Sequence, residues 1–334
     1  MHIIIMRLRS SGQSVTSVFA AIIMFGLMAG MKVPALSQDQ APAQDSLTIL
    51  LDWYVNPDHA PLLIAKQLGY FEDQNLDVEL IAPADPSLPP KLVAAGRGDI
   101  AISYQPQLYL QIAAGLELAR LGTLVATPLN ALVVLDDGPI QTIADLKGRK
   151  VGYSVAGMES MLLGTMLAGA GLSLEDVELV NVNFALTSAL ASQQVDAVIG
   201  AFRNFELTLL ALAGTKGRSF FVEEYGVPAY DELIYVVKQD RLQDPVMARF
   251  MDAIERATHF MLNHPEQAMA AMIDYDSKLD DTLNRRAFDD TLHRFAQSPR
   301  AFDPVRYQRF ADYLTQNGLV EDLPALEIYA PFPK

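Results

Sequence analysis

Polar and aromatic side chains that could bind a small molecule are concentrated near residue 50 of the 334-residue chain. Six of the eight residues from 52 to 59 are of this kind: Asp52, Trp53, Tyr54, Asn56, Asp58 and His59. They follow the apolar run 47–51, which is typical of a strand buried on both faces of a parallel sheet. They precede a helix start at Pro61. Because ligands of open α/β sheets bind at the carboxyl ends of strands, this loop is predicted to line a binding site.

Three further loops, at residues 103–107, 155–160 and 200–206, are predicted to meet the first one. Each adjoins the carboxyl end of a predicted strand. The loops at 52–59 and 103–107 would line one wall of a cleft, and the loops at 155–160 and 200–206 would line the other. Met158 either floors the pocket or, as is more common for methionine, fills the core. Together the four loops supply these candidate ligand-binding residues: Trp53, Tyr54, Asn56, His59, Tyr104, Gln105, Gly157, Met158, Glu159, Asn204 and Glu206.

The charges of these loops favour a neutral or weakly basic ligand. Arg203 is the nearest cation in the sequence, whereas a binder of sulfonate, nitrate or phosphate ordinarily offers several. Glu206 could accept hydrogens from both a protonated ring nitrogen and the neighbouring amine of an aminopyrimidine. The alternative is that Glu206 is a first-turn helix charge facing solvent. Trp53 and Tyr54 likewise either face a ligand or belong to the core at a strand end.

The apolar pattern alternates strands and helices in two successive units, which predicts an α/β protein with two cores. The chain crosses to the second unit near Pro128 and returns near Pro228. The prediction is therefore a first domain at 47–129 plus 228–334, which includes four C-terminal helices, and a second domain at 130–227. No internal repeat is present.

The first loop and its surroundings also resemble one protein family. The resemblance is carried by Leu50, Leu51, Trp53, Asn56, His59, Leu62 or Leu63, Ala65, Gly69, Tyr70 and Phe71, followed by Leu76 to Val78. These residues look like those of periplasmic binding proteins that bind sulfonates or thiamine pyrimidine precursors, a family that includes fungal pyrimidine synthases. The resemblance implies a type II periplasmic binding protein fold: two α/β domains, each with a mostly parallel sheet flanked by helices, and a ligand in the interdomain cleft.

The resemblance further implies a substrate-binding protein of an ABC importer, with a permease and ATPase complex as partners. The segment 200–206 is similar to one in which a glutamate of the pyrimidine binders reads the heterocycle. The ligand expected is therefore a thiamine pyrimidine precursor of the hydroxymethylpyrimidine or formylaminopyrimidine type. Alternatives are a sulfonate, another small heterocycle, or a pyrimidine-synthesising enzyme.

Enzymatic activity is disfavoured by the residues that are missing. The fungal synthases donate a lysine and a histidine from the segment matching 103–107 and carry a cysteine-rich run. Here that segment reads Ser-Tyr-Gln-Pro-Gln, and the chain has no cysteine. The sequence also lacks an H-E-x-x-H motif and a P-loop. We therefore expect no catalytic residue, no cofactor and no metal.

The N-terminus resembles a secretory signal peptide. Arg7 and Arg9 precede an apolar run at 15–31 and a small-residue exit at 35–37, which predicts a signal peptide at 1–37 and a flexible tether at 38–46. Without those first residues, 22 basic residues face 40 acidic ones, so the surface should repel nucleic acid and anionic membrane. We expect a monomer in the periplasm.

Overall fold

The computed structural model describes residues 44–332. The predicted signal peptide at 1–37 lies outside that range, and so does most of the predicted tether at 38–46. The first strand begins at Asp45, so the last two tether residues belong to it. Within the described residues, no helix combines the length and apolar character needed to span a membrane.

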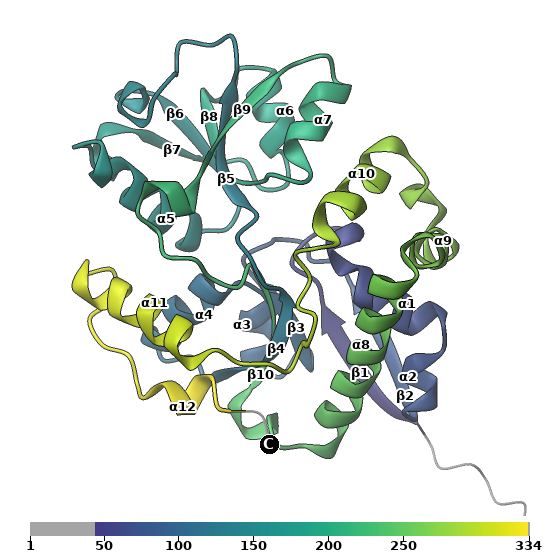
Figure 1. Ribbon diagram of the computed structural model, residues 1–334. Coiled ribbons are helices and arrows are strands. Elements are labelled where there is room, and N and C mark those ends of the chain that lie inside the picture. Colours follow the sequence, from purple (N-terminus) through teal and green to yellow (C-terminus); the bar gives the residue numbers. More distant parts are fainter. Residues whose placement is uncertain (1–43, 333–334) are drawn as a thin grey trace, which may run out of the picture. The chain divides into compact units, whose positions relative to one another are not determined.

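Two five-stranded sheets form the framework (Figure 1). The first sheet has the order β2-β1-β3-β10-β4, in which β10 runs antiparallel to both of its neighbours and the other pairings are parallel. Its strands are β1 (Asp45–Leu50), β2 (Leu76–Ile81), β3 (Ile100–Ser103), β4 (Leu118–Val125) and β10 (Leu233–Lys238). One reversed strand in an otherwise parallel-running sheet agrees with the expected fold class.

The second sheet repeats this plan with the order β7-β6-β8-β5-β9, and here β5 is the reversed strand. Its strands are β5 (Asn130–Leu135), β6 (Lys150–Tyr153), β7 (Glu178–Asn181), β8 (Ala197–Phe202) and β9 (Gly217–Phe221). The sequence analysis missed β9, because Gly217, Arg218 and Ser219 hide the apolar pattern of a strand. The chain thus has the predicted two-domain α/β fold, whereas the domain boundaries at 129 and 227 stay a prediction.

Helices flank both sheets, and several begin at prolines, whose fixed φ suits a first helical turn. Around the second sheet lie α5 (Met158–Gly169), α6 (Leu186–Ala191) and α7 (Glu206–Leu212). The remaining helices are α1 (Ala60–Gln67), α2 (Tyr70–Asp73), α3 (Pro89–Ala94), α4 (Gln105–Ala113), α8 (Pro245–Asn263), α9 (Pro265–Tyr275), α10 (Thr282–Thr291), α11 (Pro304–Gln316) and α12 (Leu326–Tyr329). Short 3-10 turns include η1 (Pro57–His59), which leads directly into α1.

Two element ends differ from the sequence prediction, and both lie at the predicted loops. Helix α4 already begins at Gln105, because Tyr104 has extended backbone as its N-cap and a proline follows at once. Strand β8 continues to Phe202, inside the loop predicted at 200–206. Helix α10 stops at Thr291, and Phe295 beyond it pairs with Val125 at the end of β4.

The crossing from β4 to β5 is held by two charged side chains. A carboxylate oxygen of Glu232, at the start of β10, accepts the backbone N–H groups of Leu129 and Asn130, at 2.5 and 2.9 Å. Arg203 donates to the carbonyl oxygens of the same two residues and forms a bidentate pair with Glu223, at 2.7 and 2.8 Å. The polar backbone of this buried crossing is therefore satisfied, which fixes the path from the first sheet to the second.

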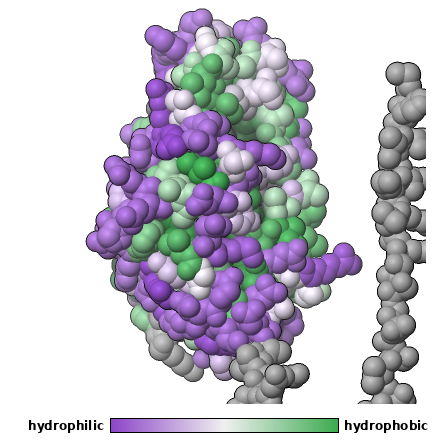
Figure 2. All heavy atoms as spheres, turned by 90° about the vertical axis from the view of Figure 1, so that its right-hand side faces the viewer, coloured by the Kyte–Doolittle hydropathy of each residue, from purple (hydrophilic) through white to green (hydrophobic). Residues whose placement is uncertain are grey.

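The surface seen in Figure 2 carries hydrophilic residues interspersed with hydrophobic ones. Scattered apolar side chains are normal on protein surfaces. This face therefore gives no argument for a particular macromolecular partner.

Candidate functional site

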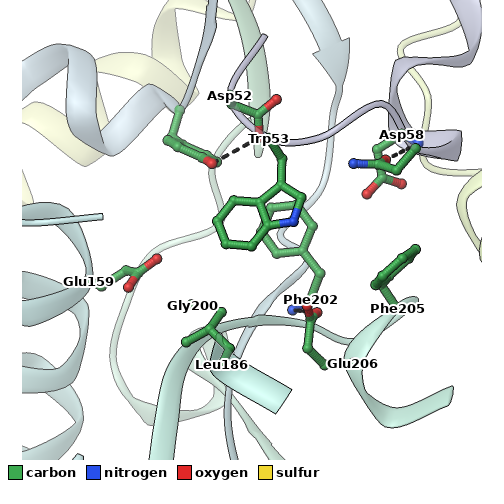
Figure 3. A pocket seen from close by; sticks show the side chains of 11 residues that line it. Asp52, Trp53, Asp58, Glu159, Leu186, Gly200, Phe202, Phe205 and Glu206 are labelled. Carbon is green, nitrogen blue, oxygen red and sulfur yellow. Dashed lines mark hydrogen bonds between the residues drawn. The ribbon is translucent and has the colours of Figure 1, made fainter. Parts of the chain in front are cut away.

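A cavity lies where loops from the two sheets meet (Figure 3), and the space within it amounts to about 470 Å³ when the part open to solvent is included. Carboxyl groups and aromatic rings dominate its lining: Asp52, Trp53, Asn56, Asp58, Tyr104, Glu159, Leu186, Gly200, Phe202, Phe205 and Glu206. The predicted convergence of the four loops thus produces a cavity, although which of these residues bind a ligand stays a prediction.

Of the eleven candidate binding residues, five line this cavity: Trp53, Asn56, Tyr104, Glu159 and Glu206. The six others lie outside its lining: Tyr54, His59, Gln105, Gly157, Met158 and Asn204. Four residues of the second group are buried, His59, Gln105, Met158 and Asn204, and their contacts are described below.

Asp52 organises the wall from the first sheet. One of its carboxylate oxygens accepts the Tyr104 hydroxyl at 2.9 Å, and the other accepts the Nε2 hydrogen of His59 at 2.9 Å. His59 Nδ1 in turn accepts the backbone N–H of Asn56. Burial raises the pKa of the Tyr104 hydroxyl well above its ordinary value, so the group remains a donor. His59 is therefore a positioning residue behind the cavity wall.

Gln105 and Tyr54 were both predicted to face the ligand, but neither side chain lines the cavity. Gln105 is buried in the first turn of α4, where its side-chain oxygen accepts the backbone N–H of Asp231 at 2.7 Å. Tyr54 is 53% exposed, and its ring centroid lies 4.5 Å from that of Phe184. Trp53 contacts the same Phe184 ring edge-on at 4.6 Å. Phe184, from the loop between β7 and α6, thus joins both aromatic residues of the first loop.

Gly157 and Met158 begin helix α5 without facing the cavity. Gly157 is the N-cap, with φ at +85°, a conformation that glycine adopts without strain. Met158 is fully buried in the core, which is the second of the two roles predicted for it. Asn204 is also buried, and its amide donates to Asp58 Oδ1 at 2.7 Å and to Thr291 Oγ1 at 2.6 Å.

Glu159 enters the cavity from the first turn of α5. Its carboxylate accepts the backbone N–H of Ser154 at 2.6 Å and that of Val155. A Cβ atom at Gly200 would stand only 2.2 Å from Glu159 Oε1, and Gly200 has a φ of +96°. The glycine in β8 is therefore required for this carboxyl group to lie where it does.

Glu206 has a closely similar setting at the start of α7. Its carboxylate accepts the backbone N–H of Phe202 at 2.6 Å and its own backbone N–H. A carboxylate can accept about four hydrogen bonds, so acceptor positions remain for a ligand. Glu206 is only 8% exposed and lines the cavity. This contradicts the alternative in which Glu206 is a helix charge that faces solvent.

Burial changes the protonation of three carboxyl groups in this cavity. Desolvation raises the pKa of Glu159 and of Glu206 to about 8, and that of Asp58 to about 6. In each case the hydrogen bonds that the carboxyl group accepts lower its pKa, but by less than desolvation raises it. Near neutral pH the two cavity glutamates therefore carry a proton.

Cations are absent from the residues that line the cavity. Arg203, the one cation expected nearby, is occupied by Glu223 and by the crossing, and its guanidinium stacks over the Phe221 ring at 3.9 Å. Within 44–332, no group of acidic, histidine or cysteine side chains is arranged to hold a metal ion. The cavity therefore offers hydrogen bonding by carboxyl groups that lie among apolar rings.

The sequence analysis missed several lining residues. Phe202, Phe205 and Asp58 stand in the predicted loops, but an aromatic or acidic residue there gives no signal of which way it points. Leu186 lies in α6, outside any predicted loop. In Figure 3, Asp58 and Glu159 lie on either side of the Trp53 indole, with Glu206 between them along the wall from the second sheet.

Comparisons with known proteins agree with this picture. A family model described as "NMT1/THI5 like" matches residues 56–268. A Haemophilus influenzae protein whose provisional name refers to thiamine biosynthesis is 53% identical over 289 residues, covering 86% of this chain and 92% of that protein. The formylaminopyrimidine-binding protein of Halalkalibacterium halodurans is 32% identical over 248 residues, covering 74% of each.

More distant matches include both a synthase and a binding protein. A 4-amino-5-hydroxymethyl-2-methylpyrimidine phosphate synthase of Aspergillus parasiticus is 26% identical over 266 residues, covering 76% of this chain and 77% of the enzyme. The structure of the alkanesulfonate-binding protein SsuA from Xanthomonas axonopodis pv. citri, bound to MOPS, shares the fold with a TM-score of 0.65 at 19% identity, covering 84% and 94%. The resemblance seen in the first loop is therefore confirmed, and the chain belongs to the NMT1/THI5-like family.

Proposed function

We propose that this protein binds an aminopyrimidine precursor of thiamine as the substrate-binding component of an ABC importer. The proposal is carried by one observation: the cavity combines several carboxyl groups with aromatic rings and has no cation in its lining. Such a site suits a flat ring that donates hydrogen bonds and can carry a proton. The formylaminopyrimidine-binding relative supports this class of ligand.

Glu206 is the residue proposed to read the heterocycle. Burial raises its pKa to about 8, so near pH 7 the carboxyl group carries a proton. A neutral aminopyrimidine can take that proton on its ring nitrogen, while its exocyclic amine donates to the second oxygen. The ion pair is formed inside the site from two neutral partners, so no charge has to be desolvated on entry.

The aromatic residues are proposed to hold the faces of the ring. Trp53 comes from the loop after β1, whereas Phe202 ends β8 in the second sheet. Trp53 also packs against the apolar cluster of the second sheet. A ring between them would therefore contact residues from both sheets at once, as expected when a ligand is enclosed between two domains.

Two rival functions fit the cavity less well. A sulfonate would place its negative charge beside Asp58, in a cavity whose lining offers no arginine or lysine to offset it. A synthase needs reactive groups, and the segment 103–107 supplies neither lysine nor histidine. Binding without turnover is thus the favoured function.

The ligand-reading role of Glu206 can be tested by calorimetric titration. Glu206→Gln should weaken binding of an aminopyrimidine by roughly 10- to 100-fold, since hydrogen bonds to a charged group are worth about 1.5–3 kcal/mol. Trp53→Phe should weaken it less, because phenylalanine keeps most of the stacking face, and a ring contact is worth about 0.5–1.5 kcal/mol beyond its area.

The matched control is Glu178→Gln, a glutamate of β7 whose side chain is 63% exposed. It should bind as the parent does. A des-amino pyrimidine should be insensitive to Glu206→Gln, and an alkanesulfonate should not bind at all. If Glu206→Gln binds the amino and des-amino ligands as the parent does, the glutamate has no part in recognition.

Absence of turnover is tested by incubating the protein with pyridoxal phosphate and iron. We expect the mass of the protein and the amount of the cofactor to stay unchanged, because the lysine, histidine and cysteines of the fungal synthases are missing. Mass spectrometry of the small molecules in the mixture measures this. Formation of a pyrimidine would show that the protein is an enzyme.

Export is proposed from the order of charged, apolar and small residues in 1–37. Expression of the full chain in a Gram-negative host should give a soluble periplasmic protein shortened by about 37 residues. Cell fractionation with intact-mass analysis checks the prediction. Recovery of the full-length chain from the membrane fraction would contradict both the location and the importer role.

The stability of the unliganded protein should depend on pH through the buried glutamates. Because the pKa of Glu159 and of Glu206 is about 8 in the folded state and near 4.5 ordinarily, the folded protein binds more protons than the unfolded one between these values. The free energy of unfolding should therefore fall as pH rises from about 5 to 8. Denaturant unfolding at several pH values measures this fall.

Glutamine variants separate these two residues from other titrating groups. Glu159→Gln and Glu206→Gln should each make the fall shallower, by on the order of 1–3 kcal/mol across the window. The exposed Glu178→Gln should leave the slope unchanged. Slopes equal to that of the parent in both cavity variants would mean that neither glutamate holds a proton in the folded state.

A further inference from the structure

Asp58 is a cavity carboxylate to which the proposed recognition of the ring assigns no role. It lies in η1, and its backbone N–H is held by the side chain of Asn56 at 2.8 Å. The residue is only 3% exposed, yet it lines the cavity beside Asn56. Its backbone is therefore fixed, and its carboxyl group is directed to one place.

The carboxyl group of Asp58 is held from one side. Its Oδ1 accepts the Asn204 amide at 2.7 Å and contacts the Thr291 hydroxyl at 2.9 Å. Among the described residues, no hydrogen bond reaches its Oδ2. One oxygen thus belongs to the protein, and the other is left for a ligand.

This arrangement leaves a polar atom of the protein unsatisfied. Asn204 is 2% exposed, and its Oδ1 is buried without a hydrogen-bond partner among residues 44–332. Leaving such an atom unpaired is unfavourable by roughly the strength of a hydrogen bond. The Asn204 amide is therefore oriented so that its nitrogen donates to the carboxylate of Asp58, and its own oxygen is left without a donor.

Asp58 is placed to meet a different part of the ligand from Glu206. Their charges are close enough for Asp58 to raise the pKa of Glu206, yet they come from the walls of different sheets. Asp58 and Glu159 lie on either side of Trp53 in Figure 3. A ring held by Glu206 could therefore direct a substituent toward Asp58.

The charge balance of the cavity favours a cationic substituent. A protonated ring offsets the charge of Glu206 only, and the lining residues include no cation that could offset Asp58. A hydroxyl group would bring one donor and no charge, whereas a protonated primary amine brings three donors and a positive charge. Charge-assisted hydrogen bonds are about twice as strong as neutral ones.

We propose that Asp58 is a second specificity-determining carboxylate, and that the preferred ligand is an aminopyrimidine whose side chain ends in a protonated primary amine. The inference rests on the proposed function and narrows its ligand class. The side-chain amine would donate to Asp58 Oδ2, while Asn204 and Thr291 hold Oδ1. These two are positioning residues.

Two ligands that differ at one group provide the test: a 4-amino-5-aminomethylpyrimidine and its 5-hydroxymethyl counterpart. In calorimetric titrations at pH 7, the unmodified protein should bind the aminomethyl ligand at least about tenfold more tightly. Asp58→Asn should remove this preference, weakening the aminomethyl ligand at least about tenfold and the hydroxymethyl ligand less than about threefold.

The control variant is Asp77→Asn, an exposed acid in β2 that makes the same change in net charge. It should keep the preference of the parent. Comparison of the two ligands on the unmodified protein requires no variant, so instability of Asp58→Asn would not prevent the test.

The outcomes separate this inference from the proposed function. If the unmodified protein binds both pyrimidines equally, or if Asp58→Asn weakens both to the same extent, Asp58 does not read a side-chain amine and the inference is wrong. The proposed function would stand in that case, provided that Glu206→Gln still weakens both. If the unmodified protein binds neither pyrimidine, both proposals are wrong.

Discussion

The structure depends on the way in which the buried crossing at Leu129 and Asn130 is satisfied. Glu232 accepts both of its N–H groups, and Arg203 donates to both of its carbonyl oxygens. Without Glu232, the N–H groups of Leu129 and Asn130 would be buried without an acceptor, which is unfavourable. The crossing is also joined to the end of β8, because Asn130 pairs with Phe202 and the backbone N–H of Arg203 donates to the Leu129 carbonyl oxygen at 2.9 Å. The same arginine is thereby withdrawn from the cavity, so one interaction both fixes the framework and removes the cation that an anionic ligand would need.

The parts of the site that were predictable are those set by the local pattern of the chain. The apolar run before Asp52 forms β1, and the carboxyl ends of strands meet at one edge, so four loops could be expected to converge. Glu159 and Glu206 each follow a strand and open a helix, which directs both toward that edge. The restart of the alternation after Asn130 predicted the second sheet. These features depend on periods and turn residues that a single sequence displays.

The rest of the site depends on contacts between residues far apart in the chain. Asp58 meets Asn204 and Thr291 across 146 and 233 positions, and no local pattern marks such a partnership. Phe184 joins Trp53 from a loop that carries no polar motif. Gln105 was expected in the cavity because the helix was predicted to start later. Starting α4 at Gln105 turns that side chain toward Asp231.

The fold alone does not decide the ligand, because a chain with this fold also forms an alkanesulfonate-binding protein. The decisive features are the carboxyl groups that the cavity buries without cations. Burial raises the pKa of Glu159, Glu206 and Asp58, which means that each group is less stable as an anion here than in water. The donor groups of Ser154, Phe202 and Asn204 could equally well donate to an uncharged acceptor. Hydrogen bonding within the protein therefore does not explain why all three positions carry an acid. A ligand that brings positive charge removes this disadvantage, and the site is then most stable when it is occupied.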